Sequence, residues 1–120
     1  MRLAATVLVG AVAGLHVYFL VLEMFLWRTP FGRRTFGTTV EAAESSAVLA
    51  ANQGLYNGFL AAGLLWGLVW YGLIGGRPII EFFLVCIVVA GVFGGVTVSR
   101  RILVVQAAPA AIAAALVLLS

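Results

Sequence analysis

Long runs of apolar residues dominate the chain, and short segments with charged residues, prolines and glycines separate them. A helix needs ~20 apolar residues to cross the ~30 Å hydrocarbon core of a bilayer. The runs therefore predict four membrane-spanning helices. These helices cover about 3–27, 49–74, 79–98 and 102–119.

The connection over 28–38 is predicted to be a loop at the membrane interface. Its proline and its glycines disfavour a helix, and its two phenylalanines suit the boundary between lipid and water. After it, Thr38-Thr39-Val40-Glu41 matches a capping box in which Thr38 is the N-cap. The second helix should therefore begin just after Thr38 and extend outside the bilayer from about residue 39.

Glycines four residues apart predict where helices pack closely, because a small residue lets a neighbouring backbone approach. Pro109 should kink the last helix, because it removes the backbone hydrogen bond to Val105. The glycine pairs are Gly10 and Gly14, Gly54 and Gly58, Gly63 and Gly67, Gly72 and Gly76, and Gly91 and Gly95.

Composition excludes a soluble globule. Of the 120 residues, 64% are hydrophobic and only 9% are charged, whereas soluble domains carry about 25% charged residues. The expected fold is a single all-α transmembrane domain over 1–120, an integral membrane four-helix bundle. Nucleic acid is not expected as a partner, because no basic stripe alternates with stacking aromatic residues.

The arginines predict the orientation in the membrane. Five of the seven fall in the first and third connections, and two fall on the opposite side. Cytoplasmic loops carry the excess of arginine and lysine. We therefore predict a multi-pass protein of the cell inner (plasma) membrane with both termini outside and with 28–38 and 99–101 in the cytoplasm.

Few polar side chains interrupt the apolar runs, and four of them open the second run. At ~100° per residue, these four share one side of a helix, while Gly54 and Gly58 fall on the other side. One helix is thus predicted to have a polar face and a close-packing face. The four polar residues are Asn52, Gln53, Tyr56 and Asn57.

The first span contributes Glu23 and, about two turns deeper on the same face, His16. An ionisable side chain inside a span usually faces the interior of the bundle and marks a functional site. Since lipid offers no hydrogen bonds, Glu23 should meet the carboxamides of the second span. For His16, a proton relay and a structural role stay open.

Polar residues from all four predicted spans lie at a similar depth in the membrane. This predicts one shared polar pocket in the cytoplasmic third of the bundle, with His16 at its floor. Thr97 and Ser99 lie at this level but are assigned to capping or interhelical contact. His16 and Glu23 are the candidate catalytic residues. No metal or cofactor is expected, because the chain has one histidine and one distant cysteine. The predicted ligand-binding residues are His16, Glu23, Trp27, Asn52, Gln53, Tyr56, Asn57 and Gln106.

Three segments look familiar: LHVYFLVLEMFLW at 15–27, TPFGRRTFG at 29–37 and AANQGLYNGFLAAG at 50–63. Together they resemble the bacterial four-span membrane-protein family filed as domain of unknown function 1304. The resemblance supports the four-span architecture and supplies no reaction. It also picks out His16, Glu23, Trp27, Asn52, Gln53, Tyr56 and Asn57.

Three functions fit these observations. The main hypothesis is a pocket that binds, or also transforms, a lipid-like or other hydrophobic small molecule. The second is a small proton-coupled transporter using Glu23, similar in architecture to the small multidrug resistance exporters. The third is an accessory subunit of a larger membrane complex. The expected partners are the lipid bilayer, a hydrophobic small molecule, and either a second copy or another membrane protein; no enzymatic activity is assigned.

Overall fold

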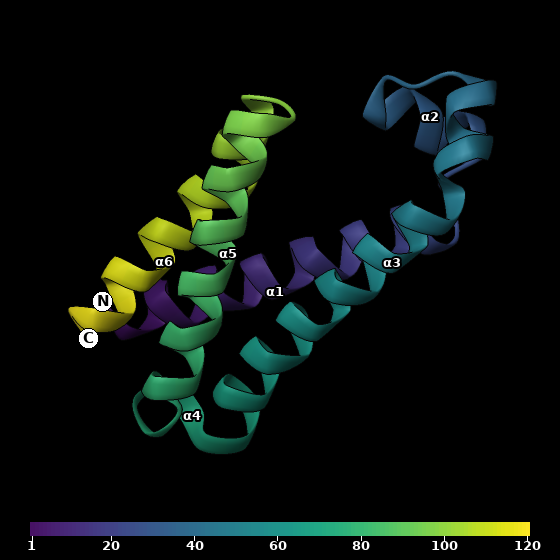
Figure 1. The fold of residues 1–120 in the computed structure, drawn as a ribbon. Coiled ribbons are helices and arrows are strands. Elements are labelled where there is room, and N and C mark those ends of the chain that lie inside the picture. The colour runs from purple at the N-terminus through teal and green to yellow at the C-terminus, as the bar shows by residue number, and fades with distance from the viewer. The chain divides into compact units, whose positions relative to one another are not determined.

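The computed structural model describes all 120 residues, and every regular element in it is a helix. The all-α fold class is thereby confirmed. Figure 1 labels the α-helices, and the π-helical turns η1 and η2 lead directly into α4 and α6. The elements are α1 (Arg2–Met24), α2 (Pro30–Phe36), α3 (Val40–Leu65), η1 (Trp66–Trp70), α4 (Tyr71–Gly75), α5 (Arg77–Thr97), η2 (Leu103–Ala107) and α6 (Ala108–Leu118).

Three helices are long and apolar enough to cross a membrane. They are α1, the 36-residue stretch Val40–Gly75, and α5. The last apolar helix, Leu103–Leu118, is shorter than these three. The helices therefore indicate a membrane protein, while the fourth crossing stays a prediction.

The chain folds as two compact units, one formed by 15–59 and the other by 1–14 together with 60–120. The core of the second unit contains only alanine, valine, leucine and isoleucine side chains. Helices in lipid gain little from hiding apolar surface from one another, so close packing of small and branched side chains must hold such a core together. Its buried members are Ala5, Val9, Val12, Ala13, Leu64, Ile80, Leu84, Ile87, Ala110, Ala113 and Val117.

The glycine contacts in the second unit are partly as predicted. A Cβ atom added at Gly91 would lie 2.8 Å from the Ala107 backbone nitrogen, and one added at Gly67 would lie 2.8 Å from Ile80 Cγ1. Gly63 packs against Phe83 and Gly95 against Leu103 in the same way.

Two glycine predictions are wrong. A Cβ atom added at Gly10 or Gly14 would meet nothing within 4 Å, so this pair makes no close contact. Gly72 is not a packing residue either, because it adopts a φ of 79° at a kink between η1 and Gly76. A positive φ is a conformation that glycine adopts without a steric cost. A helical wheel gives the direction of a glycine but does not reveal whether a neighbour lies there.

The segment predicted as a loop over 28–38 contains the helix α2, and this is a correction. Thr29 is its N-cap, with the Thr29 hydroxyl oxygen accepting a hydrogen bond from the Gly32 N–H at 3.1 Å. Pro30 occupies the first helical position, where its missing N–H costs nothing. Gly37 ends the helix with a φ of 64°. Pro30 and Gly37, taken as helix breakers, are therefore the two ends of a helix, while Gly32 lies within it.

The long helix begins one residue later than predicted. Thr39, not Thr38, is the N-cap of α3, because the Thr39 hydroxyl oxygen accepts from the Ala42 N–H at 3.1 Å. Glu41 then occupies the second helical position, so the predicted capping box does not form. Near the other end of the chain, the irregularity expected at Pro109 takes the form of the π-helical turn η2 just before it.

Candidate functional site

Within the unit 15–59, α3 packs against α1 through two glycines, as predicted. A Cβ atom added at Gly54 would lie 2.6 Å from Met24 Cγ and 3.1 Å from Glu23 Cβ. One added at Gly58 would lie 2.6 Å from Leu20 Cδ1. The absence of side chains on these glycines lets the two helix backbones approach, which brings a short side chain on α3 within reach of α1.

That short side chain is Asn57, which donates a hydrogen bond from Nδ2 to Glu23 Oε1 at 2.5 Å. The two residues lie 34 positions apart in the chain, and both are half-buried. The bond occupies one oxygen of the carboxyl group and one N–H of the carboxamide. Glu23 Oε2 and Asn57 Oδ1 take no hydrogen bond in the structure, and neither is enclosed by protein. Two acceptor atoms are thus open beside a formed contact.

His16 lies on the same helix but is not part of this contact. Its side chain is fully buried, and its ring meets the Phe19 ring edge-on at 5.4 Å between centroids. Seven residues separate it from Glu23, or ~10 Å along the helix axis. The structure therefore does not join the two candidate catalytic residues directly.

Trp27 has a structural role. Its indole Nε1 donates to the Ser46 hydroxyl oxygen at 3.1 Å, and Ser46 donates in turn to the Ala42 carbonyl at 2.6 Å. The indole ring also packs on Phe36 of α2, with the ring centroids 4.9 Å apart. Trp27 thereby ties the end of α1 to both α2 and the first turns of α3. Sequence reasoning did not identify Ser46 as its partner, because no spacing rule pairs residues across the α2 connection.

The four residues of the predicted polar face of α3 do not share one environment in the structure. Only Asn57 turns toward α1, while Asn52, Gln53 and Tyr56 are exposed. On the helical wheel Asn57 lies about 60° from Gly54, close enough to join the packing face. Gln53 lies about 40° from Asn57 on its other side, and Asn52 lies about 140° away. Gln53 thus flanks the Glu23–Asn57 contact, whereas Asn52 and Tyr56 point elsewhere.

Gln106 belongs to the other unit, where it is half-buried in η2. In that unit Thr97 donates to the Phe93 carbonyl at 2.7 Å, and the Ser99 hydroxyl accepts from the Arg101 N–H at 3.3 Å. Both are local contacts at a helix end, so of the two predicted roles, capping and interhelical contact, the structure shows only local hydrogen bonds for Thr97 and Ser99.

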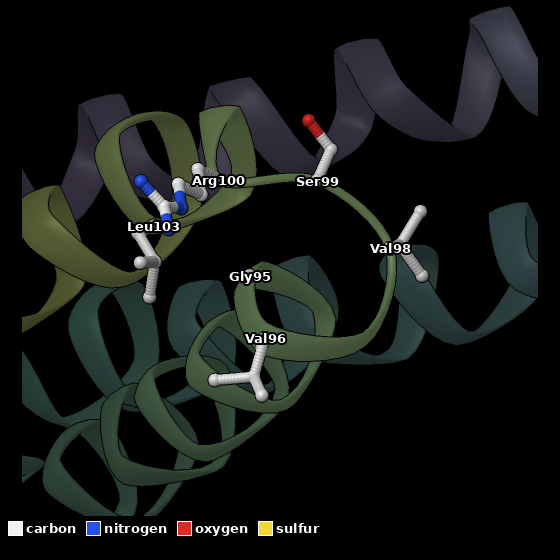
Figure 2. Close-up of a pocket in the computed structure, with 6 residues that line it drawn as sticks. All are labelled: Gly95, Val96, Val98, Ser99, Arg100 and Leu103. Atoms are coloured by element: carbon white, nitrogen blue, oxygen red, sulfur yellow. The ribbon is translucent and has the colours of Figure 1, made fainter.

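The same unit has a surface depression of about 340 Å³ where α5 turns into η2. Figure 2 shows the labelled side chains spread around this turn rather than converging on one point. None of the predicted ligand-binding residues lines it. Its lining residues are Gly95, Val96, Val98, Ser99, Arg100 and Leu103.

Charged groups near the Glu23–Asn57 contact are few. The Arg28 guanidinium lies 3.8 Å from Glu44, and both side chains are well exposed, so this ion pair adds little stability. No arginine pairs with Glu23, whose polar contact is Asn57. The chain has no group of three or more histidine, cysteine, aspartate or glutamate residues arranged to hold a metal ion.

Comparison with known proteins extends over almost the whole chain. Residues 10–118 match the family described as "Protein of unknown function (DUF1304)". The chain is also similar to the uncharacterized protein YpaA of Lactococcus lactis subsp. lactis, at 26% identity over 104 residues. That alignment covers 84% of this chain and 86% of the relative. No solved structure matches the chain.

Proposed function

The chain belongs to the DUF1304 family of proteins of unknown function, as its sequence resemblance indicated, and we propose that it binds an amphipathic, lipid-like small molecule in the membrane. The polar head of this molecule contacts Glu23 and Asn57, and Gln53 flanks the head on the exposed side. The observation that supports this proposal is the pair of open acceptor atoms, Glu23 Oε2 and Asn57 Oδ1, beside a formed hydrogen bond.

The surroundings of these two residues favour a ligand with an apolar tail. Polar atoms at the edge of the hydrocarbon core gain no hydrogen bonds from lipid tails, so a polar head group can provide contacts that lipid tails cannot. Apolar side chains exposed on other sides of both helices indicate that this unit faces lipid; they include Val17 and Val21 on α1 and Leu55 and Phe59 on α3. The tail of the molecule lies within the lipid, so no enclosed cavity is required.

The site is proposed to lie near the cytoplasmic surface of the inner membrane. The arginine distribution supports this placement, because the α2 segment next to the site holds Arg33 and Arg34 and follows Arg28. With four spans, both termini would then lie outside. This topology is open to a direct test with single cysteines in a Cys86→Ala background. The exposed positions Ala42 and Gly75 should be labelled from opposite sides.

Ligand retention tests the proposed function. Wild-type protein released from its native membrane should keep an amphipathic molecule that native mass spectrometry detects. Asn57→Leu removes an open acceptor and the bond to Glu23, so this variant should lose the molecule. Asn52→Leu is the matched control, because Asn52 is a carboxamide on the same helix that is exposed and makes no contact with Glu23. Equal retention by the two variants would contradict the site.

A second candidate function, the accessory subunit, is favoured by a different observation. Asn52 and Tyr56 are exposed on the side of α3 away from Glu23, and a carboxamide that faces lipid has no partner there. A second protein packed on that side would supply one. In this case Asn52→Leu, and not Asn57→Leu, should abolish co-purification with a partner. Proton-coupled transport, which also uses Glu23, is separated from both functions by proton-dependent flux into sealed vesicles.

A further inference from the structure

The open atoms at Glu23 and Asn57 also define a class of head group. We propose that the site selects a primary ammonium group on an apolar chain, in preference to a neutral alcohol or an anion. This inference rests on the proposed function, because it names the ligand of that same site. It concerns the charge and the hydrogen-bond donors of the head group.

The hydrogen-bond inventory at the site favours a donor-rich ligand. Asn57 has already donated one N–H to Glu23 Oε1. Two acceptors remain, Glu23 Oε2 and Asn57 Oδ1, against a single remaining N–H on the carboxamide. An ammonium group carries three donors and no acceptor, so it can bond to both open oxygens at once. A hydroxyl group has one donor and can bond to only one of them in this way.

The charge at the site favours the same ligand. Glu23 has no arginine partner, since the ion pair of this unit joins Arg28 to Glu44. Burial disfavours a lone charge, and Glu23 is half-buried at the end of an apolar helix. A bound ammonium group would stabilise the Glu23 carboxylate, because attraction between opposite charges strengthens where water is scarce. A carboxylate or phosphate head would instead be repelled by the Glu23 carboxylate. It also has no hydrogen-bond donor for the two open acceptor atoms. An anion is therefore the least suitable head group for this site.

Gln53 extends the selection to the exposed side of the site. It lies one turn from Asn57 toward the start of α3 and about 40° around the helix. Its side chain is exposed and makes no hydrogen bond in the structure. It can accept the third N–H of the ammonium group, whereas Asn52, about 140° from Asn57, cannot reach it. Gln53→Ala should therefore weaken amine binding, and Asn52→Ala should leave it unchanged.

Four probes with the same apolar chain test the inference: dodecylamine, dodecyltrimethylammonium, dodecanol and dodecanoate. Binding is measured at neutral pH to protein in nanodiscs of neutral lipid, with empty nanodiscs as the background. Wild type should bind dodecylamine at least about tenfold more tightly than dodecanol, a difference of ~1.4 kcal/mol, and should bind dodecanoate most weakly. Dodecyltrimethylammonium has the charge but no N–H donor, so its affinity should fall below that of dodecylamine.

Two glutamate variants locate the selectivity. Glu23→Gln removes the charge while keeping the shape, so the preference for dodecylamine over dodecanol should disappear. Glu81→Gln, in α5 of the other unit, is the control and should keep the preference. If Glu23→Gln fails to fold, Glu23→Asp keeps the charge and should retain the order of the probes.

The failures of the two proposals look different. If dodecanol or dodecanoate binds as tightly as dodecylamine, or if Glu23→Gln keeps the amine preference, the inference on the head group is overturned while the binding function stands. If dodecyltrimethylammonium binds as tightly as dodecylamine, the role of the open hydrogen-bond acceptors is overturned. If no probe binds above the empty nanodiscs, and the protein retains no native molecule, the proposed function itself fails.

Discussion

Both units of the chain pack their helices through glycines, and the unit 15–59 also has hydrogen bonds between distant side chains. In both, glycines let helices approach: Gly54 meets α1 in the unit 15–59, and Gly91 meets the Ala107 backbone in the other. The core of the second unit contains only aliphatic side chains, and Thr97 bonds locally within its own helix. The unit 15–59 adds hydrogen bonds between side chains far apart in the sequence.

This difference distinguishes contacts that pack the helices from polar side chains that can bind a ligand. The core of the second unit combines glycine contacts with aliphatic packing, and its members carry no polar side chain. Side-chain hydrogen bonds between membrane helices contribute only ~0.6 kcal/mol on average. The carboxyl group of Glu23 is therefore a costly way to gain a small amount of stability, which argues that its position serves binding.

Glycine replacement should give the largest effect on stability, and it should act on both units. Gly91→Leu and Gly54→Leu force a side chain into a neighbouring helix, so each should lower the free energy of unfolding by ~1–3 kcal/mol or more. Gly91→Leu should be the more severe, because its nearest neighbour is backbone, whereas Gly54 first meets the flexible Met24 side chain. Thermal unfolding in detergent measures both.

The controls for this experiment are Gly10→Leu and Gly14→Leu. A Cβ atom at either position meets nothing within 4 Å, and leucine is the better helix former by ~1 kcal/mol. Both variants should be as stable as wild type or more stable. If Gly10→Leu or Gly14→Leu lost as much stability as Gly54→Leu, the space around a glycine would not indicate whether its helix face is packed.

The second prediction concerns α2, which occurs only in the unit 15–59. Thr29→Ala removes the N-cap bond to Gly32 and should destabilise this helix by ~1 kcal/mol. Hydrogen exchange should show faster exchange at Gly32 and its neighbours, with no change in α5. Thr29→Ser, which keeps a hydroxyl acceptor, should restore protection. Unchanged exchange in Thr29→Ala would indicate that the contact between Trp27 and Phe36 alone holds α2.

The smallest expected effect is the coupling energy between Glu23 and Asn57, which tests whether their hydrogen bond serves stability. A double-mutant cycle with Glu23→Ala and Asn57→Ala should give a coupling energy of ~0.6 kcal/mol, with ~1.7 kcal/mol as the upper end of such bonds. Unfolding of the two single variants and of the double variant supplies the cycle. A coupling several times larger would assign the pair to stability and remove the argument that its position serves binding.

Much of the fold could be predicted from the sequence, because apolar runs and helix lengths are set by the bilayer. The error at 28–38 had a physical source. Proline and glycine disfavour the middle of a helix but favour its first position and its end, and Thr29-Pro30 followed by Gly37 is that arrangement. Only the spacing of these residues, long enough for two turns, distinguishes a short helix from a loop.

The candidate site could be predicted only in part, because a helical wheel gives angles and not neighbours. Asn57 lies between the predicted polar and packing sides of α3. Because α1 approaches at Gly54, Asn57 belongs to the packing side and contacts Glu23. For Trp27, position in the sequence gave no sign that its indole bonds to Ser46. Glu23 was identified correctly as a residue that meets a carboxamide, since an apolar segment leaves it few other partners.

The π-helical turn η1 affects how this protein tolerates insertions and deletions. A π-helical turn bonds residue i to i+5, so it holds one residue more than an α-helical turn. Deleting one residue within Trp66–Trp70 would let the helix continue as a regular α-helix. Because the wider turn already absorbs the extra residue, the residues beyond it, Tyr71 first among them, would keep nearly their present direction. The same deletion in a regular part of α3 would instead rotate everything beyond it by about 100°. Loss of a single codon is therefore better tolerated within Trp66–Trp70 than elsewhere in this stretch.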